Sequence, residues 1–412
     1  MKFAVRLVVT TFVTFLAVVV VFQQFIIIDA GTERPSSSRR LLDALEQRWS
    51  SLPKSFVNIT SRTYALGAIH DARKGNMAAP CVRVLLVARF TQRFQCRFTS
   101  GAIVDGGKLY EMSENHAMAY GVYFLNCPVP DDEIVGDTVE VKSIRTPWSR
   151  VPVIYNISKL VEAERYIYEL TICLPFLFGR RYSGATLVEF VELNQLLGVQ
   201  HFVVYLDDSD IDNSLRKAID YYEQLKVVEV SRLRLPVDFK KIWHHGQLVA
   251  ITDCLYRGMG VSRFVAFHDL DEFLIPQVSR SSTLNAPLLT LLHRLFEENV
   301  ASIRVPTQYM ALKDKGDLIT LRNTLARRYV DPTLTKCVVR PEMIFEQGIH
   351  HTSRVIQDHY VSPLVSNDIL RLYHYKVSDG SKTDDTILEN YGKLLRQRFE
   401  DVVERIGLYR SP

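Results

Sequence analysis

The sequence lacks the short motifs of several common enzyme classes, and it lacks a strong charge imbalance. Its 412 residues contain no GxxxxGK[ST] phosphate loop, no GxSxG elbow and no HExxH helix motif. These absences argue against the common ATPase, serine hydrolase and zinc peptidase classes. The formal net charge is only +4, and no stripe of Lys and Arg interleaved with aromatic residues occurs. The composition therefore does not suggest a nucleic-acid-binding protein.

Cysteine is sparse, with six residues that permit three bridges in about fifteen connectivities. Cys96 and Cys127 flank strand-like segments, which favours a bridge between them. Cys173 and Cys254 lie in apolar runs, where buried free thiols are at least as well supported as a bridge.

One long uncharged segment stands at the N-terminus. Leu7–Ile28 contains no charged residue, and at about 1.5 Å per residue it can span the roughly 30 Å core of a bilayer. Basic residues precede it and acidic residues follow, which predicts residues 1–6 in the cytosol and the rest in the lumen. A cleaved signal peptide is the alternative, although its apolar region is usually only about 7–15 residues long. Two glycosylation sequons, Asn58-Ile59-Thr60 and Asn156-Ile157-Ser158, fit a lumenal body.

Three regions follow this membrane anchor. Residues 29–79 begin with a polar stretch and are interpreted as a stem. Residues 80–160 are rich in strand-like runs and predict a small β-sandwich-like module. In residues 161–412, strands and helices alternate, which predicts an α/β domain with a mostly parallel sheet and right-handed crossovers. The expected strands are Tyr168–Pro175, His201–Leu206, Val227–Val230 and Arg263–Phe267, and the expected helices are Leu187–Leu197, Ser214–Leu225 and His244–Gly258.

An acidic motif lies inside an apolar segment, RFVAFHDLDEFLIP at Arg263–Pro276. Burying its three carboxylates is costly unless a cation neutralises them. Asp269 and Asp271 are two positions apart, so on an extended backbone they share a face. Carboxylate oxygens suit Mg²⁺ or Mn²⁺, which could hold the two phosphates of a nucleotide diphosphate. A solvated turn after a strand is the alternative interpretation.

Other polar residues stand where ligands bind in α/β sheets. Asp207 and Asp208 directly follow the expected strand His201–Leu206, and ligands bind beyond the carboxyl ends of such strands. Gln247 and Asp253 lie on the helix before the acidic motif and could contact a nucleotide. Asp253 could instead pair with Arg257 four residues on, and this pairing is slightly favoured.

Five blocks then form a pattern. They are LVEFVELNQLLGVQHFVVYLDD (187–208), GQLVAITDCLYR (246–257), FHDLDEFLIP (267–276), KCVVRPE (336–342) and RLYHYK (371–376). In this order they resemble glycosyltransferase family 92 over roughly residues 165–380. The resemblance implies a GT-A fold, a type II Golgi membrane protein and a metal-dependent, inverting transfer of a sugar. Characterised members use UDP-galactose and make a β-linked galactose on fucose of N-glycan cores.

The resemblance also suggests roles for particular residues. Asp269, Asp271 and His374 would hold Mn²⁺ or Mg²⁺ against a UDP-sugar, although His374 alone could be a hydrogen-bonded core residue. Asp207, Asp208, Gln247 and Asp253 are the candidates for nucleotide contact. Glu342 and Glu272 are the candidate catalytic carboxylates, because an inverting transfer needs a base near the acceptor hydroxyl; an exposed, salt-bridged Glu342 is the alternative.

Two functional alternatives stay open beside this one. The same fold could use a different UDP-sugar, because pocket residues set the donor. A non-catalytic member that binds glycans or partner enzymes is the other alternative. The intact Asp269 and Asp271 argue against it, but Thr252 and Lys376, where the family pattern has Asn and Arg, leave it open.

Overall fold

The structure is a computed structural model. It describes residues 55–75, 80–89, 92–157, 166–207, 211–277, 286–376 and 379–408. The predicted tail 1–6, the predicted membrane anchor 7–28 and the candidate Asp208 lie outside these residues. In the part of the chain that is described, no helix is long and apolar enough to cross a membrane.

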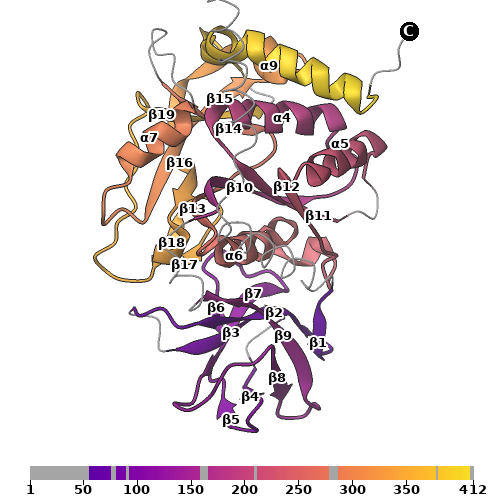
Figure 1. The fold of residues 1–412 in the computed structure, drawn as a ribbon, viewed down its shortest axis with the longest axis vertical. Coiled ribbons are helices and arrows are strands. Elements are labelled where there is room, and N and C mark those ends of the chain that lie inside the picture. Colours follow the sequence, from indigo (N-terminus) through magenta and orange to yellow (C-terminus); the bar gives the residue numbers. More distant parts are fainter. Residues whose placement is uncertain are drawn as a thin grey trace, which may run out of the picture. The chain divides into compact units, whose positions relative to one another are not determined.

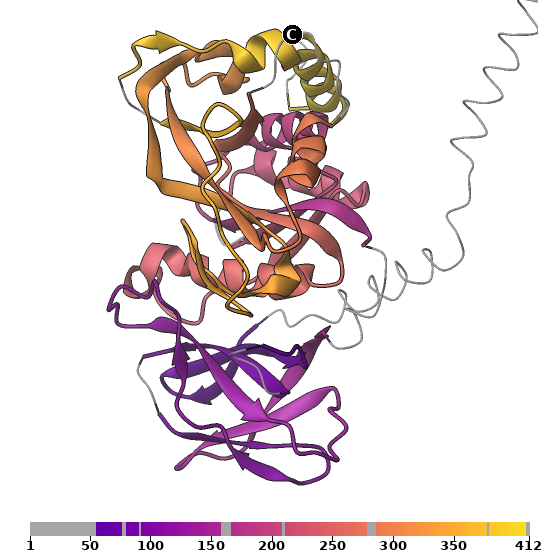
Figure 2. The same cartoon turned by 90° about the vertical axis from the view of Figure 1, so that its left-hand side faces the viewer.

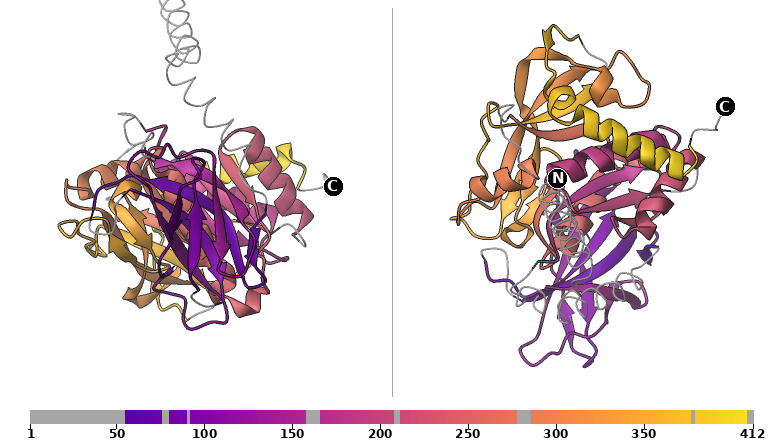
Figure 3. Two further views of the ribbon diagram at one scale, coloured as in Figure 1. Left: turned by 90° about the horizontal axis from the view of Figure 1, so that it is seen from below. Right: turned by 45° about the horizontal axis from the view of Figure 1, so that its top comes forward.

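The N-terminal part of the described chain is a nine-stranded sheet. Its strands are β1 (Val57–Thr60), β2 (Thr63–Asp71), β3 (Cys81–Ala88), β4 (Phe94–Arg97), β5 (Ile103–Asp105), β6 (Tyr110–Glu111), β7 (Gly121–Pro128), β8 (Thr138–Ser143) and β9 (Ser149–Asn156). The path through the sheet is β5-β4-β8-β9-β2-β3-β7-β6, with β1 on β2. The sheet curves so that β4 and β5 also pack on β7 (Figures 2 and 3).

Both faces of this sheet are buried at its centre. The residues at even positions of β3, such as Val84 and Leu86, pack into the core of the β-rich region. The expected bridge between Cys96 and Cys127 is present and joins β4 to β7 inside that core. Residues at odd positions of β3 face the following α/β region, where the Arg83 guanidinium lies 4.9 Å from the Phe345 ring centroid. A strand that is covered on both faces has a nearly continuous apolar sequence, as β3 has.

The predicted stem is shorter than expected at its C-terminal end. β1 and β2 lie within 29–79, yet they belong to the β-rich sheet. β2 pairs with β3 on one side and with β9 on the other, and its residues Ala65–Ile69 are buried. The polar stretch at the start of 29–79 ends before β2. Because β2 is apolar and packs between β3 and β9, it belongs to the sheet and not to the stem.

The second sheet carries the α/β region. Its path is β12 (Val228–Arg232), β11 (His201–Leu206), β10 (Tyr168–Leu177), β13 (Ser262–Phe267), β16 (Leu325–Val339), β15 (Ser302–Ala311), β19 (Leu370–Lys376) and β14 (Glu272–Pro276), with β20 (Lys382–Thr383) on β16. The hairpin β17 (Ile344–Gln347) and β18 (Thr352–Val355) stands apart from it.

The prediction of a mostly parallel sheet is correct only for one half. β10, β11, β12 and β13 are parallel neighbours. Beyond β13 the pairs β13–β16, β16–β15 and β19–β14 are antiparallel, and only β15–β19 is parallel. The regular alternation of strands and helices ends at Phe267, after which strands follow one another with little helix between them. β15 and β16 follow one another closely and pair antiparallel, because a parallel pair needs a long crossover.

Helices cover both faces of this sheet (Figures 1 and 3). α4 (Gly184–Leu197) packs against α5 (Asn213–Gln224) and α9 (Thr386–Arg405), with α7 (Pro287–Leu295) and the short α8 (Ile319–Arg322) nearby. Ser183 caps the start of α4 by accepting from the Thr186 N–H at 3.2 Å, and Gly198 ends it with φ 107°. The sequence prediction for this helix is confirmed.

α6 (Gln247–Gly258) covers the opposite face and lies between the two sheets (Figure 1). It follows the 3₁₀ turns η2 (Phe239–Lys241) and η3 (Trp243–Gly246), whereas η4 (Pro341–Met343) follows β16. A disulfide joins Cys254 of α6 to Cys173 of β10, so these two cysteines are not the free thiols that their apolar runs equally allowed. Among the described cysteines, Cys81 and Cys337 are free and buried. Both sheets belong to one compact unit, residues 53–412.

Candidate active site

The acidic motif forms a turn at the carboxyl end of β13. We call Asp269–Glu272 the acidic turn. The Asp269 N–H donates to Glu272 Oε2 at 2.8 Å, and the Glu272 N–H donates to the Asp269 carbonyl at 3.1 Å. Leu270 is buried and anchors the turn. The side chains of Asp269 and Asp271 keep 34% and 35% of their surface exposed, so both carboxylates can reach a ligand.

A lysine neutralises part of this turn. Lys336 Nζ lies 3.1 Å from Asp269 Oδ2 and 3.3 Å from Glu272 Oε2, and its side chain is only 3% exposed. Burial opposes its positive charge, yet the two carboxylates raise the pKa of Lys336. In turn Lys336 lowers the pKa of Asp269 against the effect of burial, whereas burial keeps the pKa of Glu272 raised. Lys336 of β16 therefore supplies part of the positive charge that the sequence predicted beside the acidic motif.

His374 completes the arrangement from β19. The β14–β19 register pairs it with Glu272. Its Nε2 lies 3.7 Å from Asp271 Oδ2, and its Nδ1 lies 3.4 Å from Glu272 Oε1. Burial favours the neutral imidazole, but the Asp271 hydrogen bond and the Glu272 and Asp271 charges raise the pKa of His374 overall. The sequence named this residue as a possible partner of Asp271, and the structure brings the two together.

These donors fit a divalent metal ion that is shared with a ligand. The described residues contain no group of three His, Cys, Asp or Glu side chains placed to hold a metal by themselves. Asp271 and His374 supply an oxygen and a nitrogen that face each other. Mg²⁺ typically takes one or two protein carboxylates and completes its shell with substrate phosphates and water. The pair therefore fits an ion that binds together with a diphosphate.

Glu272 has a positioning role in this arrangement. It is 3% exposed and contacts the Asp269 N–H, Lys336 and His374. A carboxylate that holds a metal-binding histidine by its second nitrogen fixes the ring orientation. These contacts favour a positioning role for Glu272, and its assignment as a catalytic carboxylate stays a prediction.

A cavity of about 850 Å³ opens beside the carboxyl ends of β10 and β11. It is lined by Phe176, Phe178, Gly179, Asp207, His245 and the segment 234–240. The His245 ring stacks on Phe178 with centroids 4.1 Å apart and on Phe239 at 4.7 Å. Asp207 thus lies where the sequence predicted, at the end of β11 and in the wall of a cavity. Such an aromatic wall suits a planar base.

The segment after β10 connects the cavity to the acidic turn. Phe178 lines the cavity, and the Arg181 guanidinium lies 5.7 Å from the ring centroids of both Phe178 and Tyr182. Burial and the charges of Asp271 and Asp269 raise the pKa of Tyr182, so its hydroxyl is near the acidic turn. Arg181 is exposed and lies near one residue of the cavity wall, Phe178, and near Tyr182. This arginine was missed in the sequence, where nothing distinguished it from Arg180.

A strained segment lies on the other side. His244 and His245 have φ of 40° and 54°, and Gly246 follows with φ 74°. Such left-handed residues are costly for side chains with a Cβ and cluster at functional sites. Burial lowers the pKa of His244, while the charge of Asp269 raises it and that of Lys336 lowers it. Gln247, the first residue of α6, is 8% exposed and directly follows this segment.

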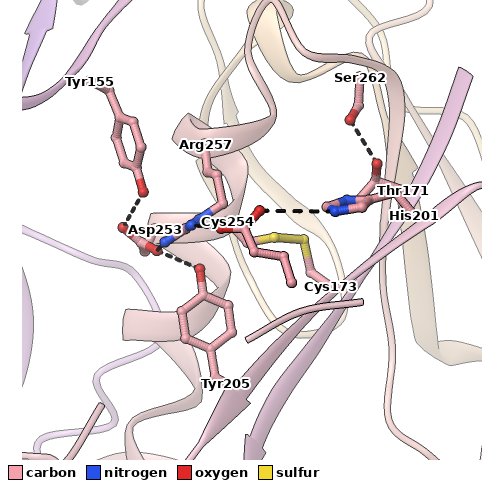
Figure 4. Close-up of a disulfide and its surroundings, with 10 residues drawn as sticks. Tyr155, Thr171, Cys173, His201, Tyr205, Asp253, Cys254, Arg257 and Ser262 are labelled. Atoms are coloured by element: carbon pink, nitrogen blue, oxygen red, sulfur yellow. Dashed lines mark hydrogen bonds and ion pairs between the residues drawn. A yellow bond between two sulfur atoms is a disulfide. The ribbon is translucent and has the colours of Figure 1, made fainter. Parts of the chain in front are cut away.

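The carboxylate of Asp253 points toward Tyr155, Tyr205 and Arg257 (Figure 4). Its carboxylate accepts hydrogen bonds from the Tyr155 hydroxyl at 3.0 Å, from the Tyr205 hydroxyl and from Arg257 at 2.9 Å. Arg257 also pairs with Glu229. We call these five residues the α6 cluster. Asp253 is 3% exposed, so the predicted nucleotide contact is wrong and the alternative pairing with Arg257 is confirmed.

Glu342 lies at the opposite edge of the sheet. β16 runs antiparallel to β13, pairing Cys337 with Phe267 and Val339 with Val265. Glu342 therefore falls beyond the amino end of β13, where it accepts from the Gly260 N–H at 2.7 Å. Burial raises its pKa. This position, at the edge of the sheet opposite to Asp269 and Asp271, argues against the prediction of Glu342 as a general base.

The sequence and the site together identify the class of protein. The chain matches the model of glycosyltransferase family 92 over residues 168–404. Beta-1,4-galactosyltransferase galt-1 of Caenorhabditis elegans is 37% identical over 377 residues, which cover 90% of this chain and 87% of that relative. The chain therefore belongs to glycosyltransferase family 92, as its sequence blocks predicted.

Solved structures show a weaker likeness. TarS residues 1–349 of S. aureus, solved with UDP, has a TM-score of 0.29 and 14% identity, covering 50% of this chain and 60% of that one. Glucosyl-3-phosphoglycerate synthase of Mycobacterium tuberculosis has a TM-score of 0.26 and 15% identity, covering 62% and 85%. At these scores the likeness supports no conclusion about the activity of this chain.

Proposed function

We propose that the chain transfers galactose from UDP-galactose, with inversion, to a hydroxyl group of fucose on an N-glycan core. One observation carries the proposal: Asp271 and His374 face each other at the carboxyl edge of the sheet, 3.7 Å apart, in a site that a cavity with aromatic walls adjoins. The family and the β-1,4-galactosyltransferase relative support galactose as the sugar.

The donor nucleotide would occupy the cavity. Its position beyond the carboxyl ends of parallel strands is where α/β sheets bind nucleotides, and it supports a GT-A interpretation of β10–β13. The His245 and Phe178 rings offer a stacking wall for uracil, and the Asp207 carboxylate offers an acceptor for sugar hydroxyls or the base N–H. Arg181 would meet the diphosphate on its way to the acidic turn.

Asp271 and His374 would hold Mn²⁺ or Mg²⁺ against the diphosphate. Such an ion, when bound, neutralises the negative charge that develops on the departing UDP. Glu272 holds the His374 ring, and Lys336 holds Asp269 and Glu272. The metal-binding side chains are thus already in place before the UDP-sugar binds, which lowers the reorganisation needed during reaction.

His244 is our proposed base. An inverting transfer needs a group that takes the proton from the acceptor hydroxyl as that oxygen attacks the anomeric carbon. His244 is exposed, is held in a strained conformation and lies within the electrostatic reach of Asp269. Its lowered pKa favours the neutral imidazole that such a base requires.

We further propose that the chain is a single-pass type II protein of the Golgi membrane with a lumenal catalytic domain. The uncharged segment 7–28 supports the anchor. Two disulfides, Cys96–Cys127 and Cys173–Cys254, support an oxidising compartment. The sequon residue Asn58 is exposed on β1, as a glycosylated residue must be.

The test is release of UDP from a panel of UDP-sugars by the purified full-length chain, over fucosylated glycan acceptors, with Mn²⁺ or with EDTA. We expect turnover with UDP-galactose that requires the metal. Turnover only with another UDP-sugar would contradict the choice of galactose. No turnover together with no UDP binding in the presence of Mn²⁺ would contradict the catalytic proposal and favour a non-catalytic glycan-binding protein.

A further inference from the structure

Backbone strain concentrates where the β-rich region meets the candidate active site. Seven non-glycine residues in the described ranges have positive φ. Four of them form two pairs, His116–Ala117 with φ of 51° and 52°, and His244–His245 with φ of 40° and 54°. The first pair lies in the loop between β6 and β7, far in sequence from the second. Strain of this kind persists only where the surroundings enforce it, and it marks functional positions.

The two pairs are joined through one aromatic side chain. The His116 ring lies over Trp243 with centroids 4.2 Å apart at 31°, and Trp243 meets His244 edge-on at 4.7 Å. The backbones are tied as well, because the Tyr120 N–H donates to the Lys241 carbonyl at 2.9 Å. The β6–β7 loop therefore rests on η3, beside the proposed base.

Two side chains hold this loop in place. Asn115 accepts from the Val122 N–H at 2.8 Å and donates to the Val122 carbonyl at 3.0 Å. Glu114 accepts from the Ile349 N–H at 2.9 Å and lies 3.3 Å from His351. The loop is thus attached both to β7 and to the β17–β18 hairpin. These contacts fix His116 over Trp243 before any ligand binds.

The aromatic surface so formed is open and close to the reacting groups. Trp243 is half-buried, whereas His116 and His244 are exposed. The proposed base His244 directly follows Trp243 and directly precedes His245, which lines the cavity. The charges of Asp269, Lys336, His116 and Glu114 all act on His244. A ligand on Trp243 would be next to the reaction site and outside the nucleotide cavity, whose lining residues do not include Trp243.

We propose that Trp243, through the part of its ring that His116 leaves open, binds a pyranose ring of the acceptor glycan, so that a loop of the β-rich region helps to form the acceptor site. The negative face of an aromatic ring attracts the polarised C–H groups on the less polar face of a sugar. The rigid loop and η3 hold this surface ready, which lowers the cost of ordering on binding. This inference rests on the proposed function for its choice of glycan. It adds a role for residues outside the matched segment 168–404.

The test measures glycan binding and donor binding separately, on the full-length chain. Binding to an immobilised fucosylated N-glycan is compared among wild type, Trp243→Ala, Trp243→Phe and His116→Asn. Asparagine tolerates the left-handed backbone of His116 while removing its ring. Trp148→Ala is the matched control, because Trp148 is also half-buried but lies between β8 and β9 under Arg97 and Lys142. UDP affinity with Mn²⁺ and KM values for donor and acceptor are measured on the same samples.

We expect Trp243→Ala to weaken glycan binding and raise the acceptor KM about tenfold, with UDP affinity and donor KM unchanged. Trp243→Phe should recover part of the loss, His116→Asn should lose less than Trp243→Ala, and Trp148→Ala should match wild type. Equal glycan binding by wild type and Trp243→Ala would overturn the inference, as would a loss confined to the donor. If the wild type does not bind UDP, the proposed function is overturned instead. The glycan-binding measurements would still decide this inference. If Trp243→Ala does not fold, His116→Asn and Trp243→Phe decide it.

Discussion

The acidic turn and the α6 cluster are both groups of carboxylates beside a buried cation, yet their surroundings differ. In the α6 cluster, Asp253 is 3% exposed, and two tyrosine hydroxyls and Arg257 satisfy its carboxylate. In the acidic turn, Lys336 faces Asp269 and Glu272, while Asp271 stays 35% exposed and lies 3.7 Å from His374. A carboxylate that the protein has fully paired serves the fold, whereas one left open at a sheet edge can serve a ligand.

The largest effect that we expect is on catalysis at the acidic turn. Asp271→Asn removes the open carboxylate while keeping its shape, so kcat should fall roughly a hundredfold to a thousandfold. The thermal midpoint should change little, because Asp271 is one-third exposed. Steady-state UDP release and thermal unfolding of the same sample measure the two quantities. Full activity in Asp271→Asn would contradict the view that the acidic turn serves catalysis while the α6 cluster serves the fold.

The α6 cluster should respond in the opposite way. Asp253→Ala leaves Arg257, Tyr155 and Tyr205 with a missing partner, and breaking such a buried pair costs about 3 kcal/mol of unfolding free energy. Denaturant unfolding measures this, with Asp271→Ala as the matched control that should lose much less. The folded fraction of Asp253→Ala should keep its affinity for UDP. A selective loss of UDP binding without destabilisation would restore the nucleotide-contact interpretation of Asp253.

The strained histidines allow a second comparison, within the site itself. His244→Asn tolerates the left-handed backbone but removes the proposed base, so kcat should fall roughly a hundredfold with UDP affinity unchanged. His245→Asn is the matched control, since it removes a ring from the cavity wall and should weaken UDP binding more than it lowers kcat. The two effects are read from kcat and from UDP titration. An unaltered kcat in His244→Asn would contradict its role as base.

A smaller effect is the pH dependence of folding stability, which should arise in part from His201 near the α6 cluster. Burial and the Arg257 charge lower the pKa of His201 to about 3. Below its ordinary pKa of about 6.5, the unfolded chain binds a proton that the folded chain does not, so stability is complete above that pH and falls as the pH drops toward 3. Wild type should lose about 2 kcal/mol more than His201→Gln between pH 7 and pH 5.

Denaturant unfolding at both pH values measures this difference. His359→Gln, at an exposed histidine, is the control and should follow wild type. Parallel losses in wild type and His201→Gln would show that the pKa of His201 is the same in the folded and the unfolded chain, and would contradict the lowered pKa.

The parallel half of the α/β region was predictable, because β10–β13 and their helices alternate in a regular pattern that ends in the acidic turn. Asp207, Asp269 and Asp271 were found for the same reason, since each follows a strand of that half. Asp253, Glu272 and Glu342 were assigned from residue type and position in the sequence, and neither shows burial. Their roles depend on partners from distant segments, such as Tyr155 and Lys336, that only the fold brings together.

The antiparallel half and the aromatic surface could not be found in the sequence for a related reason. The contact between His116 and Trp243 joins two loops more than a hundred residues apart in the sequence. Left-handed backbone at histidine has no sequence signal, unlike a glycine or an Asn-Gly turn. The sequence therefore predicted only an accessory module for the β-rich region, although one of its loops reaches the candidate active site.

Calorimetric titration of UDP with Mn²⁺ into wild type, Asp271→Asn and Asp253→Asn decides whether the acidic turn, and not the α6 cluster, holds the metal-bound nucleotide. We expect metal-dependent UDP binding in wild type and in Asp253→Asn, and its loss or a roughly tenfold to hundredfold weakening in Asp271→Asn. Equal UDP binding by wild type and Asp271→Asn, in Mn²⁺ and in EDTA alike, would contradict this assignment.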